Sequence, residues 1–434
     1  MKYDYDLAII GAGWAGFNAT RRAKKLGLKV CLIEKSALGG TCLNRGCIPT
    51  KALLQSTKAY SLAKKSPSLG IEIPELKINL AKIQERKNKI IRQLQAGMQS
   101  LLAGIDYVNS PARLKSDHEI SLEGRTISAK YTIVATGSQP VELAALKFNR
   151  KNVLSSDEIL EISELPQSLL IAGGGVIGCE FASFFAALGT RVTIVEKMPR
   201  LLPAEDQEVS QKITALFKKK GISVNVNADA AGFNPGQFGL ILSCVGRIAA
   251  TSGLGLEELG VKMERGRVIT DEYLRTNIAN ILAAGDCTGR IMLAHYASYL
   301  GIIAAENCAA PEHPRKCDNF NIPNCIFTDP EIASVGLSDE AAKEKNIAVN
   351  IHRFDFLASG MARILDETDG FLKIISSKDS GEIIGASIIG PRATELISAL
   401  TIAVTNRLEI SQLKNTIFAH PTISESIHEA LSED

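Results

Sequence analysis

A segment that joins an apolar run, a glycine-rich loop, a helical stretch and a second apolar run occurs twice in this chain. In the first copy the loop is Gly11-Ala-Gly-Trp-Ala-Gly16, and the second apolar run ends at Glu34. In the second copy the loop is Gly173-Gly-Gly-Val-Ile-Gly178, and the run ends at Glu196. The first glycines (173 − 11) and the glutamates (196 − 34) are both 162 positions apart. This shared spacing predicts two βαβ units of the same design.

Glycines in the spacing G-x-G-x-x-G have separate tasks in a dinucleotide-binding loop. The first permits a tight turn, the second lets the backbone approach a pyrophosphate, and the third allows close packing of helix on strand. A glutamate about 20 positions later is placed to accept hydrogen bonds from ribose hydroxyls, whereas a 2′-phosphate requires an arginine. One such loop is a weak signal, but two in register predict two bound dinucleotides. Glu196 favours NAD over NADP at the second site, and Arg200 keeps NADP open.

Two cysteines, Cys42 and Cys47, follow the first unit. Residues five apart on a helix lie about 140° apart around its axis, so a bond between these sulfurs requires a loop or distorted turn, which residues 44–46 supply. Pro49 suits the first position of a following helix, and a helix N-terminus favours a thiolate at Cys47. Lys51, one turn further, would share that face. Metal binding is the poorer alternative, because no second Cys or His pair has a suitable spacing. Two ordinary core cysteines remain the simplest alternative.

Composition limits the class of protein. The 434 residues predict several domains. A net charge of +2 gives no electrostatic reason to expect nucleic acid or a membrane surface as a partner. No apolar run reaches the roughly 18 residues that span a bilayer, and the chain opens without a leader pattern. The nine cysteines are mostly scattered, which is typical of free thiols in a reducing cytoplasm. We therefore expect a soluble cytoplasmic protein without a metal site.

The motifs together resemble those of the flavin-dependent pyridine nucleotide–disulfide oxidoreductases, and within that family most closely the enzymes that oxidise dihydrolipoamide. The resemblance covers almost the whole chain. It rests on the first glycine loop and on GGTCLNRGCIPTKALL (39–54), TIVATGS (132–138), GGGVIGCE (173–180), VGR (245–247), AAGDC (283–287), MLAH (292–295) and HPTISE (420–425).

The resemblance implies FAD at the first site and NAD at the second. The residues that it assigns to FAD are Gly11, Gly13, Gly16, Glu34, Lys35, Gly40, Thr41, Lys51, Ala112, Thr136, Gly137, Ser138, Asp286, Met292, Leu293, Ala294 and His295. The residues that it assigns to NAD are Gly173, Gly175, Val176, Ile177, Gly178, Glu180, Glu196 and Gly246.

The resemblance also implies the catalytic groups. Cys47 would be the thiolate beside the flavin and Cys42 the sulfur that exchanges with substrate, while Lys51 would pair with Glu180 near the nicotinamide. His420 and Glu425 would be a base and its orienting carboxylate, contributed by the partner subunit of a homodimer. Independently, dithiol oxidation requires a base, and histidine has the appropriate pKa range. A second interpretation stays open: residues 422–425 also form a capping box, and His420 would then be an ordinary turn residue.

The expected fold is α/β, with two Rossmann-like nucleotide-binding domains and a C-terminal α+β dimerisation domain. The predicted limits are 1–149 for the FAD domain, 150–266 for the NAD domain, 267–317 for a segment that completes the FAD domain, and 318–434 for the dimerisation domain. Residues 221–245 are about half as long as in the family, so we expect a shortened antiparallel meander in the NAD domain.

The expected activity is oxidation of protein-bound dihydrolipoyl groups to lipoyl, with reduction of NAD through a Cys42–Cys47 disulfide and FAD. The partners would be lipoyl domains of a 2-oxoacid dehydrogenase or glycine cleavage complex. Three alternatives remain: a glutathione-type reductase, a mercuric reductase, and a catalytically decayed flavoprotein that serves as an assembly subunit. Mercuric reductases usually end in a vicinal cysteine pair, and this chain has no cysteine after Cys325.

Overall fold

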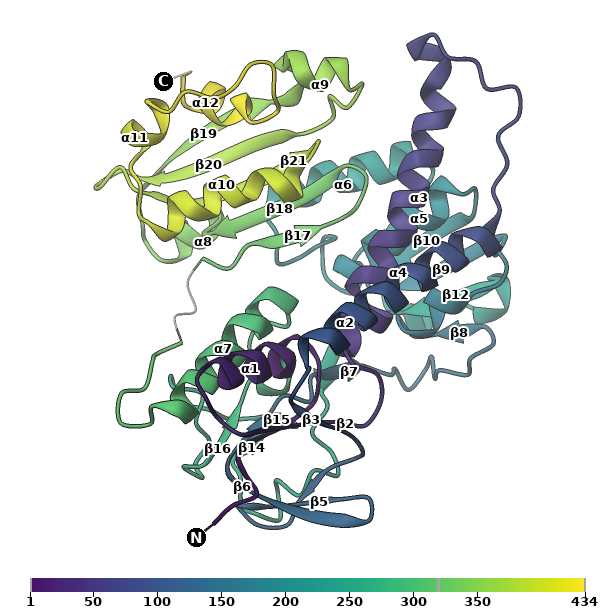
Figure 1. Cartoon of the computed structure of the whole chain (residues 1–434). Coiled ribbons are helices and arrows are strands. Elements are labelled where there is room, and N and C mark those ends of the chain that lie inside the picture. The colour runs from purple at the N-terminus through teal and green to yellow at the C-terminus, as the bar shows by residue number, and fades with distance from the viewer. Residues whose placement is uncertain (1, 318–320, 433–434) are drawn as a thin grey trace.

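The computed structural model describes residues 2–317 and 321–432 (Figure 1). Its first sheet has the strand order β3-β2-β1-β6-β5-β4, and β16 pairs with β6. Pairing is parallel from β3 through β1 to β6 and on to β16, whereas β4, β5 and the start of β6 form an antiparallel meander. These strands are β1 (Tyr5–Ile10), β2 (Val30–Glu34), β3 (Asp106–Asn109), β4 (Arg113–Leu114), β5 (Glu119–Leu122), β6 (Arg125–Val134) and β16 (Ile281–Ala283).

Five helices accompany this sheet: α1 (Trp14–Lys25), α2 (Gly40–Arg45), α3 (Cys47–Lys65), α4 (Leu80–Leu101) and α7 (Ala294–Ala309). Helices α1 and α7 lie side by side although about 280 residues separate them (Figure 1). Their backbones touch at Gly301, where a Cβ atom would lie 2.1 Å from the carbonyl oxygen of Ala15. Residues 281–309, which follow the second domain in the chain, therefore pack on the first domain.

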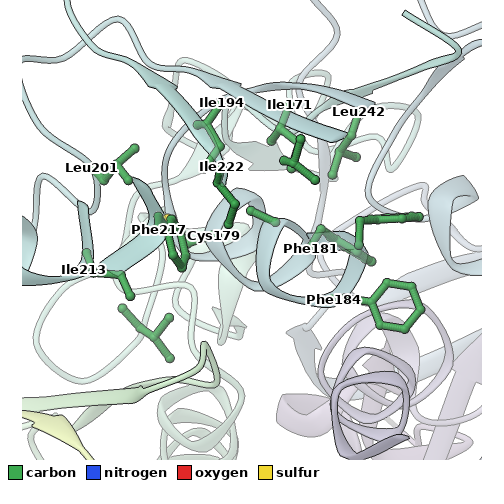
Figure 2. Close-up of a cluster of buried hydrophobic side chains, with 14 of the residues drawn as sticks. Ile171, Cys179, Phe181, Phe184, Ile194, Leu201, Ile213, Phe217, Ile222 and Leu242 are labelled. Atoms are coloured by element: carbon green, nitrogen blue, oxygen red, sulfur yellow. The ribbon is translucent and has the colours of Figure 1, made fainter. Parts of the chain in front are cut away.

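The second sheet is wholly parallel, with the order β11-β10-β9-β12-β8. Its elements are β8 (Val153–Leu154), β9 (Ser168–Ala172), α5 (Val176–Ala187), β10 (Arg191–Val195), α6 (Gln207–Lys219), β11 (Ser223–Asn225) and β12 (Leu240–Ser243). Phenylalanines of α5 and α6 pack against the apolar side chains of these strands (Figure 2). Residues 221–245 contain two 3₁₀ turns, η3 (Ala230–Gly232) and η4 (Pro235–Gln237), and no antiparallel strand pair, so the expected meander is absent and not merely shortened.

The C-terminal sheet has the order β17-β18-β21-β20-β19, and all its pairs are antiparallel. Its elements are β17 (Asn324–Ile326), β18 (Glu331–Gly336), α8 (Asp339–Glu344), β19 (Val349–Asp355), α9 (Gly360–Ile364), β20 (Phe371–Ser377), β21 (Ile383–Gly390), α10 (Ala393–Thr405), α11 (Ile410–Lys414) and α12 (Glu425–Ser432). Lys373 of β20 is buried, and its ammonium nitrogen lies 2.5 Å from Asp206 and 3.1 Å from both Glu208 and Asp339. This ion cluster joins the C-terminal domain to the start of α6.

Short elements complete the chain: η1 (Ser66–Leu69), β7 (Ser138–Pro140), η2 (Glu158–Glu161), β13 (Arg247–Ala249), β14 (Met263–Glu264), β15 (Arg267–Val268), η5 (Asp286–Thr288) and η6 (Phe356–Ala358). Strands β7 and β13 form a separate two-stranded antiparallel sheet. The α/β fold with two Rossmann-like sheets and an α+β C-terminal domain is confirmed. The predicted domain limit at residue 318 lies outside the described residues. Within those residues, no helix is long and apolar enough to cross a membrane.

Candidate active site

The carboxyl ends of β1 and β9 pass into two turns of the same shape. Gly11 has φ +106° and Gly173 has φ +111°, which L side chains rarely adopt. The third glycine of each loop packs on the first: a Cβ at Gly16 would lie 1.8 Å from the Gly11 oxygen, and one at Gly178 would lie 2.0 Å from the Gly173 oxygen. The predicted tasks of the first and third glycines are therefore present in both loops.

The second glycines, Gly13 and Gly175, are not required by packing within the described chain. A Cβ at Gly175 would meet no described atom within 4 Å, and one at Gly13 would meet only Gly40, at 3.9 Å. Each is the N-cap residue of its helix, α1 or α5, and neither helix start has a side-chain cap. Free N–H groups at a helix N-terminus, with room beside them, are what a pyrophosphate requires. Both loops therefore fit a dinucleotide.

The two glutamates hold their loops in the same way. Glu34 Oε2 accepts the Ala12 N–H at 2.8 Å, and Glu196 Oε2 accepts the Gly174 N–H at 2.6 Å. In each case Oε1 accepts the N–H two residues beyond the glutamate. Each carboxylate is thereby oriented at the strand end, where the lone pairs that remain can accept ribose hydroxyls.

Arg200, the residue that could have bound the 2′-phosphate of NADP, binds other residues of the chain. Its guanidinium lies 2.9 Å from Glu340 of α8 and donates to the carbonyl oxygens of Pro203 and Glu205. A 2′-phosphate would have to compete with these bonds, so the geometry favours NAD.

Polar groups that follow β6 and β16 fit the flavin half of FAD. Thr136 Oγ1 is buried there with no partner among the described residues. Ser138 Oγ donates to Asp286 Oδ2 at 2.6 Å and accepts from Arg247 Nε at 2.8 Å, so the Asp286 carboxylate is fixed in position. An orphaned hydroxyl and an oriented carboxylate suit the polar chain of a flavin nucleotide.

The other residues assigned to cofactors lie around these edges. Lys35 follows β2, Gly40 and Thr41 begin α2, Ala112 lies between β3 and β4, Gly137 lies between β6 and β7, residues 292–295 lead into α7, Val176 and Ile177 begin α5, and Gly246 lies between β12 and β13.

The thiol pair spans two helices. Cys42 lies in α2, and α3 begins at Cys47, because Gly46 (φ −148°, ψ −113°) interrupts the helical path between them. The prediction that Pro49 is the first helical residue is wrong, since it is the third. Proline is tolerated there because N–H groups of the first turn have no acceptor within the helix. The Gly46 oxygen instead accepts the N–H and hydroxyl of Thr50.

The two sulfurs are free thiols, and their pKa values are shifted in opposite directions. A hydrogen bond from Cys42 lowers the pKa of Cys47 to about 7, with help from the Lys51 ammonium and against burial and Glu180. The same hydrogen bond, together with burial, raises the pKa of Cys42 far above its ordinary range. Cys47 is therefore the thiolate of the pair and Cys42 the proton donor.

Lys51 and Glu180 form the predicted pair. Lys51 Nζ lies 2.8 and 2.9 Å from the two carboxylate oxygens of Glu180, whose side chain is buried. The Phe327 N–H donates to Glu180 Oε1 at 2.9 Å, and the Phe327 ring centroid lies 4.8 Å from Lys51 Nζ. The pair therefore links α3, α5 and the start of the C-terminal domain beside Cys47.

Sequence reasoning missed Phe327 and Arg247 at this site. Phe327 contacts the pair through its backbone N–H and its ring, and neither contact with these distant residues has a local sequence signal. Arg247 is the last residue of the VGR motif (245–247), and this motif could have indicated a role for its side chain.

His420 and Glu425 form a hydrogen-bonded pair. His420 Nδ1 lies 2.8 Å from Glu425 Oε1, and the Thr422 N–H donates to Glu425 Oε2 at 2.8 Å. The Thr422 N–H and His420 together lower the pKa of Glu425. The cap is half of a capping box, because the Thr422 hydroxyl bonds to Ala419 instead of to the helix. The histidine is thus oriented by a carboxylate that also accepts the Thr422 N–H just before α12.

The structure does not bring this histidine to the cysteines of its own chain. Its side chain is 81% exposed, and the start of α12 lies far from α2 (Figure 1).

Within residues 2–317 and 321–432, no group of three or more His, Cys, Asp or Glu side chains is arranged to hold a metal ion.

Two dinucleotide loops that flank an asymmetric thiol pair define a nucleotide-dependent disulfide oxidoreductase. Residues 5–301 match the family model described as pyridine nucleotide-disulphide oxidoreductase, and residues 322–431 match the dimerisation domain of the same family. The chain belongs to this family, and its cofactors are FAD and NAD.

Curated relatives match over nearly their full length. Dihydrolipoyl dehydrogenases from Chlamydia pneumoniae and Bacillus subtilis are each 38% identical, covering 98% and 99% of this chain and 96% and 98% of their own lengths. The Geobacillus stearothermophilus enzyme of that name is 39% identical, over 97% of this chain and 94% of its own. Among solved structures, the HOCl-induced flavoprotein disulfide reductase RclA from Escherichia coli has a TM-score of 0.89 and 29% identity, over 99% of both chains.

Proposed function

We propose that this protein is a dihydrolipoyl dehydrogenase, which oxidises protein-bound dihydrolipoyl groups to lipoyl and reduces NAD⁺. The observation that carries the proposal is the asymmetric thiol pair Cys42–Cys47 beside the Lys51–Glu180 ion pair. The substrate rests on the relatives, since enzymes called dihydrolipoyl dehydrogenase match over nearly their whole length.

In the first step one substrate thiol attacks the Cys42 sulfur of the Cys42–Cys47 disulfide. The S–S bond breaks, its electron pair goes to Cys47, and a pKa of about 7 makes that thiolate a good leaving group. The partner subunit's His420 takes the thiol proton and is held in orientation by Glu425.

The second thiol of the substrate then attacks the substrate sulfur that is bonded to Cys42, and this closes the lipoyl ring. The electron pair of the broken bond goes to Cys42, which takes a proton. The substrate has lost two electrons and two protons, and the thiol pair is reduced. Bound FAD, held by the residues assigned to it above, supplies the redox chemistry that returns the pair to a disulfide and delivers electrons to NAD⁺.

The homodimer is part of the proposal. His420 is exposed and lies far from Cys42 of its own chain (Figure 1), and residues 322–431 match a dimerisation domain. A two-fold interface would let each subunit supply its histidine to the other site. The scattered cysteines support a reducing compartment such as the cytoplasm.

The partners that we propose are the lipoyl domains of a 2-oxoacid dehydrogenase or glycine cleavage complex. The domain limits 1–149, 150–266, 267–317 and 318–434, and the cofactor and catalytic roles of individual residues, belong to the same proposal.

Anaerobic turnover of the purified holoenzyme tests the substrate. Dihydrolipoamide with NAD⁺ should give rapid NADH formation, whereas NADH or NADPH with glutathione disulfide or mercuric ion should give little turnover. Preference for either of these acceptors would replace the lipoyl substrate with a glutathione-type or mercuric reductase. No turnover despite bound FAD would support the decayed flavoprotein.

Mixed dimers test the shared site. Cys42→Ser and His420→Gln variants should each lose most activity alone, by about 10²-fold or more for the base. When the two are unfolded and refolded together, hybrid dimers should contain one intact site and recover activity. Recovery should not occur if both residues serve the same chain. Refolded wild type is the control for yield.

A further inference from the structure

Asn44 lies between the two cysteines of the thiol pair and holds the short helix that carries Cys42. It belongs to α2, which has six residues and no side-chain cap. A helix of this length is not stable by itself in water. The Asn44 Nδ2 atom donates to the carbonyl oxygen of Gly40 at 2.8 Å and to that of Leu38 at 3.0 Å. The amide therefore ties the last turn of α2 to the residues at and before its start.

The oxygen of this amide accepts a hydrogen bond from a distant residue. Helices α2 and α4 lie side by side (Figure 1), and Gln95 of α4 donates from Nε2 to Asn44 Oδ1 at 2.6 Å. The orientation of both amides is fixed. Turning Asn44 over would place its oxygen against two carbonyl oxygens, and turning Gln95 over would bring two amide oxygens together. Gln95 is therefore the donor that the position of Asn44 requires.

Helix α4 is itself anchored, through its other half, to the second nucleotide-binding domain. Lys87 is fully buried, and its ammonium nitrogen donates to the carbonyl oxygen of Leu160 at 2.7 Å and to the Glu161 carboxylate at 2.6 Å. Gln84 donates to the carbonyl oxygen of Ile162 at 2.9 Å. These acceptors belong to η2 or directly follow it. The helix is thus fixed by contacts that do not involve α2 or the cysteines.

We propose that Gln95 is a positioning residue for thiol–disulfide exchange. Through Asn44 it holds α2, so that the Cys42 sulfur stays within bonding reach of the Cys47 sulfur after the disulfide has opened. The inference rests on the proposed exchange chemistry at this thiol pair, but not on which dithiol is the substrate.

The physical basis is the effective concentration of one sulfur at the other. A disulfide fixes its two sulfurs about 2.05 Å apart, so it restrains α2 without help. In the dithiol that constraint is gone, and the hydrogen bond between Gln95 and Asn44 restrains the helix. Groups that are held in the geometry of their reaction combine more favourably than groups that move freely. Without the hydrogen bond the dithiol gains freedom that the disulfide does not, and the equilibrium shifts toward the dithiol.

The test measures the equilibrium between this disulfide and dithiothreitol in the holoenzyme. The protein dithiol gives two electrons and two protons to oxidised dithiothreitol, so the ratio of the two protein forms reports the stability of the Cys42–Cys47 bond. Samples equilibrated anaerobically at a series of reagent ratios are quenched in acid. Reduced and oxidised cysteines are then labelled with light and heavy N-ethylmaleimide. The tryptic peptides 36–45 and 46–51 carry one cysteine each and exclude residue 95, so they are the same in every variant.

Four variants separate the donor from the packing of α4. Gln95→Met keeps the length of the side chain without a donor, and Gln95→Glu keeps its shape but places an oxygen against Asn44 Oδ1. In both, the equilibrium constant for disulfide formation should fall about fivefold, the effect of one ordinary hydrogen bond, which corresponds to a reduction potential about 20 mV higher. Gln95→Lys supplies a donor again and should recover the wild-type constant. Gln99→Met is the matched control, because Gln99 is exposed one turn further along α4, and it should leave the constant unchanged.

Wild-type constants in both Gln95→Met and Gln95→Glu overturn the proposal. An equal fall in Gln95→Lys or in Gln99→Met also overturns it, because the effect would then come from the packing of α4 and not from the donor. If the wild type forms no Cys42–Cys47 disulfide at any reagent ratio, the proposed exchange chemistry fails together with this inference. Since no lipoyl compound is used, a wrong substrate assignment leaves the result unaffected.

Discussion

Replacing Cys42 by alanine should weaken the acidity of Cys47, whereas replacing it by serine should leave that acidity almost unchanged. The hydrogen bond from Cys42 is the largest cause that lowers the pKa of Cys47. Serine keeps an O–H donor at nearly the same place, whereas alanine removes the donor and leaves burial in force. We therefore expect the pKa of Cys47 to stay near 7 in Cys42→Ser and to rise to about 9 or above in Cys42→Ala.

The magnitude follows from the size of the lowering. The pKa of Cys47 falls from 9.0 to about 7, which is worth about 3 kcal/mol in favour of the thiolate. At pH 7 about half of the Cys47 sulfurs are then ionised, against about one per cent at a pKa of 9. Since the thiolate is the nucleophile, alkylation of Cys47 at pH 7 should be about 50-fold slower in Cys42→Ala than in Cys42→Ser.

The assay follows iodoacetamide alkylation of each holoenzyme from pH 5 to 10 on the tryptic peptide 46–51. The rate should rise with pH and reach its plateau about two pH units later in the alanine variant. Lys51→Met in the Cys42→Ser background, read on the tryptic peptide 46–58 because the cleavage site at residue 51 is lost, is a second perturbation. It should also raise the pKa of Cys47 because it removes a favourable charge. Equal profiles for alanine and serine would refute the claim that the Cys42 hydrogen bond sets the acidity of the pair.

Further substitutions test the cofactor loops, the domain contact and the choice of NAD over NADP. Gly175→Ala should fold normally but raise the KM for NAD at least tenfold, because its Cβ occupies only the space left for phosphate, whereas Gly178→Ala should lower the melting temperature through its 2.0 Å backbone clash. Lys373→Met should destabilise the protein by about 3–5 kcal/mol in urea unfolding, and adding Asp206→Asn should recover part of the loss by removing the uncompensated charge. Arg200→Met should leave the preference for NAD over NADP unchanged in steady-state kinetics, since Arg200 binds other groups.

The candidate site could be predicted where its chemistry depends on local sequence. The repeat of 162 residues predicted both glycine loops and both glutamates, because each loop's geometry is set within one βαβ unit. Pairing of Lys51 with Glu180 came from the resemblance and is present at 2.8 Å. The start of α3 was misplaced because proline is a visible helix signal, whereas the backbone conformation of Gly46 is not.

Contacts between distant segments left no local signal. Lys373 lies in an apolar strand pattern, and a charged residue there ordinarily faces solvent. In the structure it is buried because Asp206, Glu208 and Asp339 approach it from other parts of the chain. Spacing along one segment cannot reveal such a cluster, since three of its four members belong to other elements.

The shortened segment 221–245 has a physical explanation that weakens the case for a decayed enzyme. In the first sheet the meander supports a returning segment: the Leu114 N–H donates to the Leu254 oxygen at 2.8 Å, and both side chains lie in one buried cluster. That segment leads back to β16 and Asp286, so the position of the Asp286 carboxylate depends on it.

The second sheet has no such segment to support, because its fifth strand, β8, precedes β9 in the chain. Around the two 3₁₀ turns, Ala230, Phe233 and Phe238 cover the sheet by packing with Ala172 and Ile241. The atoms that hold the nucleotide loop lie elsewhere and repeat those of the first sheet, from the carboxylate to the loop N–H it accepts. A meander could therefore be lost from this domain without moving a single group of the NAD site, so we expect NAD affinity to be retained.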